Sequence, residues 1–70
     1  MTFKELREKR GYPVGSKLAR DAGIHQTTVS HLDNDKHPDP RSSNLKAIAE
    51  TLGVSMETVY RAIQRTAKAA

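Results

Sequence analysis

The sequence predicts a small all-α domain of five helices, and three observations support this. Apolar residues recur at the i, i+3, i+4, i+7 spacing of one helix face, helix-capping residues precede these stretches, and glycines at positions 11, 23 and 53 interrupt them. The chain has 70 residues and no cysteine, so we expect one domain without disulfide bonds. We assign residues 1–66 to this domain and expect residues 67–70, which lack large apolar side chains, to fray.

The first predicted helix begins at Thr2. Thr2 and Glu5 have the spacing of a capping box, in which each side chain bonds a free backbone N–H at the helix start. Phe3 and Leu6 lie on the inward face of this helix. Pro13 prevents the helix from continuing, because proline lacks the N–H that a helix interior needs.

Residues 15–34 predict two short helices that meet at Gly23. The apolar residues before and after this glycine lie at helical spacing and are Leu18, Ala19, Ala22, Ile24, Val29 and Leu32. Gly23 can adopt a positive φ at no steric cost, and Ala19 is small enough for two helices to cross closely. The stretch therefore predicts a helix, a tight turn and a second helix.

The second of these helices has a polar but uncharged outer face. With Val29 at the centre of the buried face, a step of about 100° per residue keeps Leu32 and His25 near it. The side chains that point away are Thr27, Ser30, His31 and Asn34. Short hydrogen-bonding side chains suit a helix that lies in a major groove of DNA. The Gln26 amide can donate and accept at once, which matches the N6 and N7 groups of adenine.

Two more helices follow a loop that contains two prolines. We expect Asn34 to stop the preceding helix in a left-handed conformation, and Ser42 or Ser43 to cap the next one. Ser55 caps the last helix, whose apolar stripe consists of Met56, Val59, Tyr60, Ile63 and Ala67. The predicted core consists of Phe3, Leu6, Leu18, Ala19, Ala22, Ile24, Val29, Leu32, Leu45, Ile48, Leu52, Val54 and Val59.

This pattern resembles the helix-turn-helix of the Cro/C1-type phage repressors, the XRE family. The matching positions are Leu18-Ala19, Gly23-Ile24, Val29-Ser30, Leu32-Asp33, Pro40, Leu45, Ile48-Ala49 and Leu52-Gly53-Val54-Ser55. The resemblance implies a compact lambda-repressor-like fold with its helix-turn-helix at residues 15–34. It also implies a phage-like or prophage-like regulator of transcription, a repressor, that reads a near-palindromic operator in double-stranded DNA.

The resemblance further implies which residues contact DNA. The base-reading positions are Gln26, Thr27 and His31. The positions that contact the backbone or support the readers are Ser16, Lys17, Arg20, Thr28, Ser30, Asn34, Lys36, His37 and Arg41. A solvated surface is an equal alternative for Lys17 and Arg20, and the segment before Leu18 is about one residue longer than the family pattern. The family also often pairs an arginine of the first helix with an acidic residue here at Asp33, which selects Arg7 or leaves it solvated.

A homodimer is the expected working form, because one recognition helix reads too few base pairs to specify a genomic site. We expect Met56, Tyr60 and Ile63 to form its interface, either in solution or only on DNA. The alternative is that the whole stripe packs back onto the core. A second open alternative concerns function: the repressor-like fold serves as a protein-interaction module of antitoxin or inhibitor type.

Composition and charge agree with a polyanionic partner. The net charge is +4, with 12 Lys and Arg against 8 Asp and Glu. The only aromatic residues are Phe3, Tyr12 and Tyr60, too few for the stacking surface that single-stranded nucleic acid requires. The sequence lacks a signal-peptide pattern and an apolar run long enough for a membrane span, so we expect a cytoplasmic protein without a membrane partner.

No enzymatic activity, metal, cofactor or small-molecule ligand is expected. The histidines at 25, 31 and 37 are spaced by six residues, which does not bring them onto one helix face. Ser30, His31 and Asp33 have the residue types of a hydrolytic triad, but they point in different directions within one helical turn.

Overall fold

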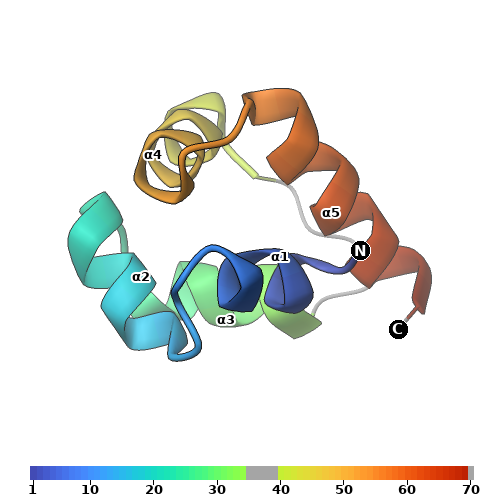
Figure 1. Cartoon of the computed structure of the whole chain (residues 1–70), viewed down its shortest axis with the longest axis horizontal. Helices are drawn as coiled ribbons and strands as arrows, with labels where there is room; N and C mark the ends of the chain where they lie inside the picture. The colour runs from blue at the N-terminus through green and yellow to red at the C-terminus, as the bar shows by residue number, and fades with distance from the viewer. Residues whose placement is uncertain (35–39, 70) are drawn as a thin grey trace.

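Five helices make up the structure, in the order α1 (Phe3–Lys9), α2 (Gly15–Ala22), α3 (Gln26–Asn34), α4 (Ser42–Leu52) and α5 (Met56–Ala69) (Figure 1). The structure is a computed structural model that describes residues 1–34 and 40–69, and these ranges contain no strand. The all-α, five-helix prediction is confirmed.

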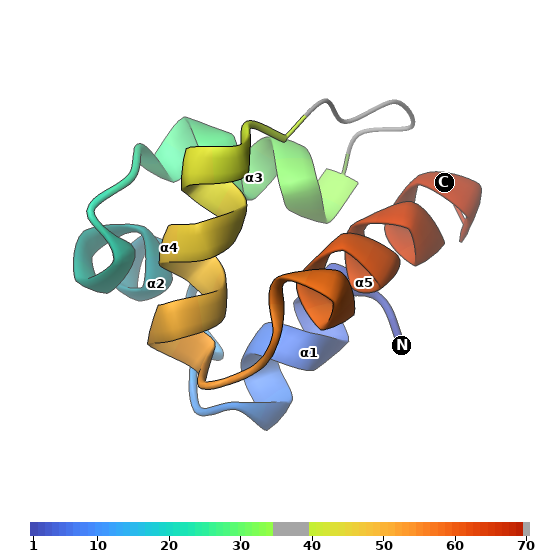
Figure 2. The same ribbon diagram turned by 90° about the horizontal axis from the view of Figure 1, so that it is seen from above.

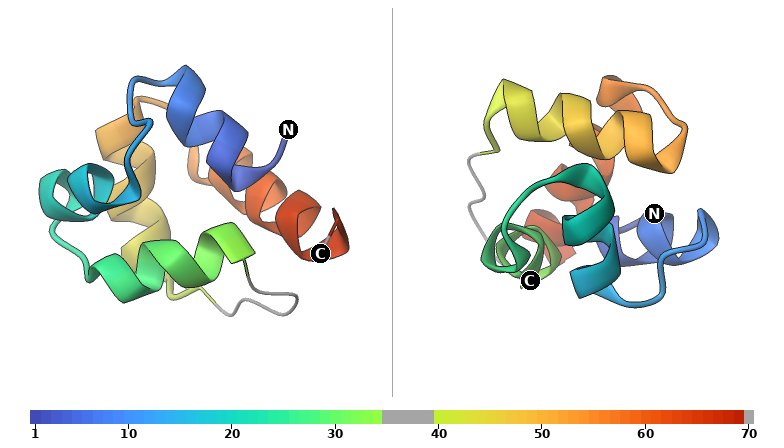
Figure 3. Two further views of the ribbon diagram at one scale, coloured as in Figure 1. Left: turned by 90° about the horizontal axis from the view of Figure 1, so that it is seen from below. Right: turned by 90° about the vertical axis from the view of Figure 1, so that its left-hand side faces the viewer.

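The helices surround one core. α2 packs against α3, and α4 lies across this pair, as the right panel of Figure 3 shows. α5 contacts α1, α3 and α4. In Figure 2, α1 and the N-terminus lie on one side of α5, and α3 lies on the other. This arrangement leaves one face of α3 free of other helices.

The helix ends follow the predicted capping chemistry at several positions. The capping box of α1 is present: the Thr2 backbone N–H donates to Glu5 Oε1 at 3.0 Å, and the Glu5 N–H donates to Thr2 Oγ1 at 3.3 Å. These bonds hold the pKa of the Glu5 carboxyl below its usual value. Ser55 Oγ accepts the Thr58 N–H at 3.1 Å at the start of α5. Gly23 ends α2 in the left-handed conformation, with φ of 73°.

Three predicted helix ends are different in the structure. Asn34 has no positive φ; it is the last residue of α3, and its side-chain amide donates to the Ser30 carbonyl at 2.9 Å. The N-cap of α4 is Arg41 rather than Ser42 or Ser43, and no side chain caps this helix. α5 continues to Ala69, beyond the predicted domain end at residue 66, while fraying of residues 67–70 stays a prediction.

Most of the predicted core is confirmed. The buried members are Phe3, Leu6, Leu18, Ala19, Val29, Leu32, Ile48, Leu52 and Val59. The partly buried members that pack against them are Ala22, Ile24, Leu45 and Val54. The structure adds Ala49, Ala62 and Ile63 to the core.

Ile63 is the main correction. It was expected at a dimer interface, but its exposed fraction is 1%. Ile63 follows Val59 by four residues, so both side chains lie on the same face of α5 and point into the core. Thr66 extends this buried face by a further turn, because its hydroxyl accepts the Phe3 N–H at 2.8 Å and donates to the Ala62 carbonyl at 3.1 Å.

Candidate nucleic-acid interface

The outer face of α3 carries polar side chains, as the sequence predicts. The exposed residues of this helix are Gln26, Thr27, Ser30, His31 and Asn34. Thr28 is half-buried, and Val29 and Leu32 are buried. His25 is exposed rather than inward-facing, because it precedes the helix and contributes its carbonyl to the first turn. No Lys, Arg, Asp or Glu side chain is exposed along α3, whose one carboxylate, Asp33, is half-buried.

A buried ion pair holds the C-terminal end of α3. Arg7 Nη2 lies 2.9 Å from Asp33 Oδ2, and Arg7 Nε donates to Asp33 Oδ1 at 3.3 Å. The two side chains are 6% and 13% exposed. Arg7 Nη1 donates to the Tyr12 and Pro13 carbonyls at 2.9 and 3.0 Å. Arg7 therefore joins α1, the segment before α2 and the end of α3, and the alternative of a solvated arginine is wrong.

A close approach at Gly15 holds the middle of α3. A Cβ atom at Gly15 would lie 3.1 Å from Val29 Cγ1 and 3.9 Å from the Arg7 guanidinium carbon. A larger residue at this position would therefore push α2 away from α3. Sequence reasoning missed this role, although a glycine in the first turn of a predicted helix was a possible signal.

A small notch of about 220 Å³ lies between the start of α2 and α3. Its lining includes Ser16 from α2 and Gln26 and Ser30 from α3. The structure therefore brings together one predicted base reader and two predicted supporting residues. Asp33 also lines the notch, with its carboxylate bonded to Arg7.

The predicted cationic contacts lie on several elements. Lys17 and Arg20 are exposed on α2, and Arg41 is exposed at the start of α4. Lys17 Nζ lies 5.9 Å from the centroid of the Tyr12 ring, which places this ammonium over an aromatic face. The predicted contacts at Lys36 and His37 lie outside the described residues.

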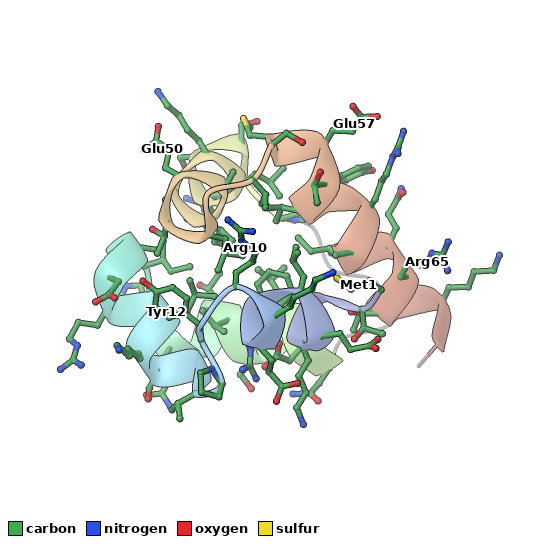
Figure 4. The ribbon with its side chains drawn as sticks, in the orientation of Figure 1. Met1, Arg10, Tyr12, Glu50, Glu57 and Arg65 are labelled. Atoms are coloured by element: carbon green, nitrogen blue, oxygen red, sulfur yellow. The ribbon has the colours of Figure 1, made fainter. Side chains whose placement is uncertain are left out.

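Tyr12 and Asp21 form a polar contact beside α2 (Tyr12 is labelled in Figure 4). The Tyr12 hydroxyl donates to Asp21 Oδ2 at 2.8 Å. This hydrogen bond to the carboxylate raises the pKa of Tyr12, because it favours the protonated hydroxyl. It also occupies an Asp21 oxygen close to Lys17.

The predicted dimer surface is smaller than expected. Met56 and Tyr60 are 40% and 45% exposed on α5, whereas Ile63 lies in the core. Residues 1–34 and 40–69 contain no group of three His, Cys, Asp or Glu side chains placed to hold a metal ion. None of the helices in these ranges has the length and apolar character that a bilayer span requires.

Comparison with known proteins gives one match. The Helix-turn-helix family model matches residues 3–59, which includes α1 to α4 and the start of α5. Neither the curated proteins nor the solved structures include a match to the chain. Proteins of this family are typically not enzymes. The chain belongs to the Cro/C1-type helix-turn-helix family, the XRE family, of DNA-binding regulators, and α2 and α3 form its helix-turn-helix.

Proposed function

We propose that this protein is a cytoplasmic, sequence-specific repressor of transcription that reads a near-palindromic operator in double-stranded DNA. The observation that carries this proposal is the outer face of α3, where exposed polar side chains lack formal charge. A charged face would bind phosphates of any sequence, whereas amide and hydroxyl groups can distinguish base edges. A bound repressor needs only to occupy a site that overlaps a promoter.

Gln26, Thr27 and His31 supply the base contacts in this proposal. All three are exposed, and Gln26 and Thr27 lie in the first turn of α3, where a recognition helix approaches the bases. The residues proposed to contact the backbone or support the readers are Ser16, Lys17, Arg20, Thr28, Ser30, Asn34, Lys36, His37 and Arg41. The Asn34 amide already donates to the Ser30 carbonyl, so Asn34 acts as a support for α3.

A homodimer supplies the second recognition helix. The domain measures 26 × 22 × 20 Å along its principal axes, whereas successive major grooves on one face of a duplex are about 34 Å apart. One copy therefore reaches one groove, and a second copy reads the other half of the palindrome. Met56 and Tyr60 are the proposed contacts between the copies, because they are large exposed apolar residues on α5.

Selection of binding sites from a pool of random duplexes tests the proposed function. We expect enrichment of an inverted repeat whose half-site centres are about 10–10.5 base pairs apart. Binding should weaken steeply with salt, because Lys and Arg contacts release counterions from the phosphates. Failure to bind any duplex even at low salt would reject DNA recognition and favour the protein-interaction alternative.

A further inference from the structure

A groove of about 620 Å³ lies between the start of the chain and the C-terminal half of α5. Its floor contains Leu6 and Ala62, which are each 4% exposed, and the Met1 side chain forms part of one wall. Met1 is 48% exposed, so this wall presents apolar surface to solvent. Figure 4 shows Met1 and Arg65 beside this half of α5.

Three cations line the same groove. Arg61, Arg65 and Lys68 are spaced at i, i+4 and i+7, which places them along one side of α5. Arg65 and Lys68 have no ion-pair partner among residues 1–34 and 40–69. Arg61 contacts Glu57 at 2.6 Å, but both side chains are at least 70% exposed, and such a surface pair exchanges readily for another anion. None of the described residues that line the groove carries a carboxylate.

The groove is separate from both surfaces assigned to the proposed function. Figure 2 shows α1 and the N-terminus on the opposite side of α5 from α3, so a duplex that docks on α3 leaves the groove open. Arg65 follows Tyr60 by five residues, which rotates its side chain by about 140° around the helix axis. The groove and the Met56–Tyr60 contact surface therefore lie on different flanks of α5.

We propose that this groove binds an acidic amphipathic helix of a partner protein. The carboxylates of such a helix pair with Arg65 and Lys68, and its apolar face covers Met1 and the floor at Leu6 and Ala62. The aliphatic stems of Arg65 and Lys68 add apolar contact area beside that floor. A DNA backbone would satisfy the cations but has no apolar face for Met1. The combination of an apolar floor and a cationic rim therefore favours an acidic helix over nucleic acid.

The test uses fluorescence anisotropy with a labelled acidic peptide. The probe has about 16 residues, with leucine at i, i+3, i+4 and i+7, glutamate beside the leucines and alanine elsewhere. We expect the double variant Arg65→Glu/Lys68→Glu to weaken binding by about tenfold or more. The control Lys9→Glu/Lys46→Glu has the same charge change on exposed residues outside the groove, and should change binding by less than about twofold.

Three further measurements separate this docking site from other causes. Thermal unfolding checks that the variants fold, and the neutral pair Arg65→Gln/Lys68→Gln should retain the fold and show a smaller loss of peptide binding. A peptide with glutamine in place of leucine should lose most of its affinity; equal binding would refute a role for the apolar floor. If the charge reversal weakens binding to a non-specific duplex as strongly as binding to the peptide, the cations form a DNA-binding surface and the proposal is wrong. No binding of the leucine-containing peptide would also overturn it.

Discussion

Asp33→Ala would leave the Arg7 guanidinium in a mostly buried site without its carboxylate. The pair lies between α1 and the end of α3, with side chains 6% and 13% exposed. Removing one partner of a buried pair typically costs about 3–5 kcal/mol, because the remaining charge is uncompensated. We expect a loss near 3 kcal/mol, since Asp33 admits some water and Arg7 keeps its bonds to two carbonyls.

A loss of this size is large for such a small domain. Domains typically have a free energy of unfolding of about 5–15 kcal/mol, so the variant would lose a substantial fraction of its stability. The corresponding decrease in melting temperature is about 12–24 °C. The variant should remain folded at low temperature, where its unfolding by urea can still be measured.

The assay is urea unfolding followed by circular dichroism, with Glu57→Ala as the matched control. Glu57 also pairs with an arginine, Arg61, but the two side chains are 70% and 74% exposed. An exposed pair contributes about 0–1 kcal/mol, so this control should shift the unfolding midpoint only slightly. If Asp33→Ala and Glu57→Ala gave equal midpoint shifts, the inference that the buried pair holds α3 in place would be refuted.

Four other predictions test the packing, the readers, the dimer and a titration. Gly15→Ala should destabilise the fold by about 1–2 kcal/mol in urea unfolding, because the added Cβ would lie 3.1 Å from a buried methyl group of α3. Gln26→Ala should relax the preference at one base pair of the selected site by about 1–3 kcal/mol. Tyr60→Asp should leave the monomer folded and abolish cooperative binding to the two half-sites in gel-shift titrations, because Tyr60 is 45% exposed. Asp21→Asn should lower the pKa of Tyr12, measured by tyrosinate absorbance. The folded state holds this proton more tightly than the unfolded chain, so its contribution to stability is complete at neutral pH and lost as pH rises through the raised pKa.

Matched variants define the outcomes that would contradict the first three of these predictions. Ser16→Ala changes an exposed neighbour of Gly15 and should leave stability near that of the parent; an equally stable Gly15→Ala protein would contradict the close-approach argument. Arg20→Ala should weaken binding to all duplexes alike, and the same uniform effect from Gln26→Ala would remove Gln26 as a reader. Lys46→Asp introduces aspartate on α4, and retained cooperativity in Tyr60→Asp as well as in this control would exclude Tyr60 from the interface.

Local pattern was sufficient for the faces of α3. A helical step of about 100° per residue separates Val29 and Leu32 from the exposed polar residues, and burial confirms this division. The same rule was wrong for His25, because it applies only inside a helix and His25 precedes the first helical residue. The period thus predicts facing well, whereas the position of a helix end depends on capping contacts.

Tertiary contacts were the part that the sequence left undetermined. The apolar stripe of α5 showed that one side of the helix is buried, but not how far its neighbours cover it, and Ile63 was therefore misplaced. Arg10 is a second example: its Nε donates to the Leu52 carbonyl at 2.8 Å and satisfies the end of α4. Arg10 and Leu52 are 42 residues apart, and nothing in the local pattern of either one indicates the other.

The direction of the α3 outer face depends on residues that lie behind it. Val29 packs against Gly15, and Asp33 binds Arg7, so two contacts with other elements hold α3 at positions four residues apart. Four residues are about one helical turn, so both contacts lie on the same buried side of the helix. A rotation of α3 by a single residue step, about 100°, would separate Val29 from Gly15 and Asp33 from Arg7 together. The orientation of Gln26 and His31 is therefore fixed by a glycine and an arginine on other elements of the chain, which is why the recognition surface can be uncharged and still be precisely placed.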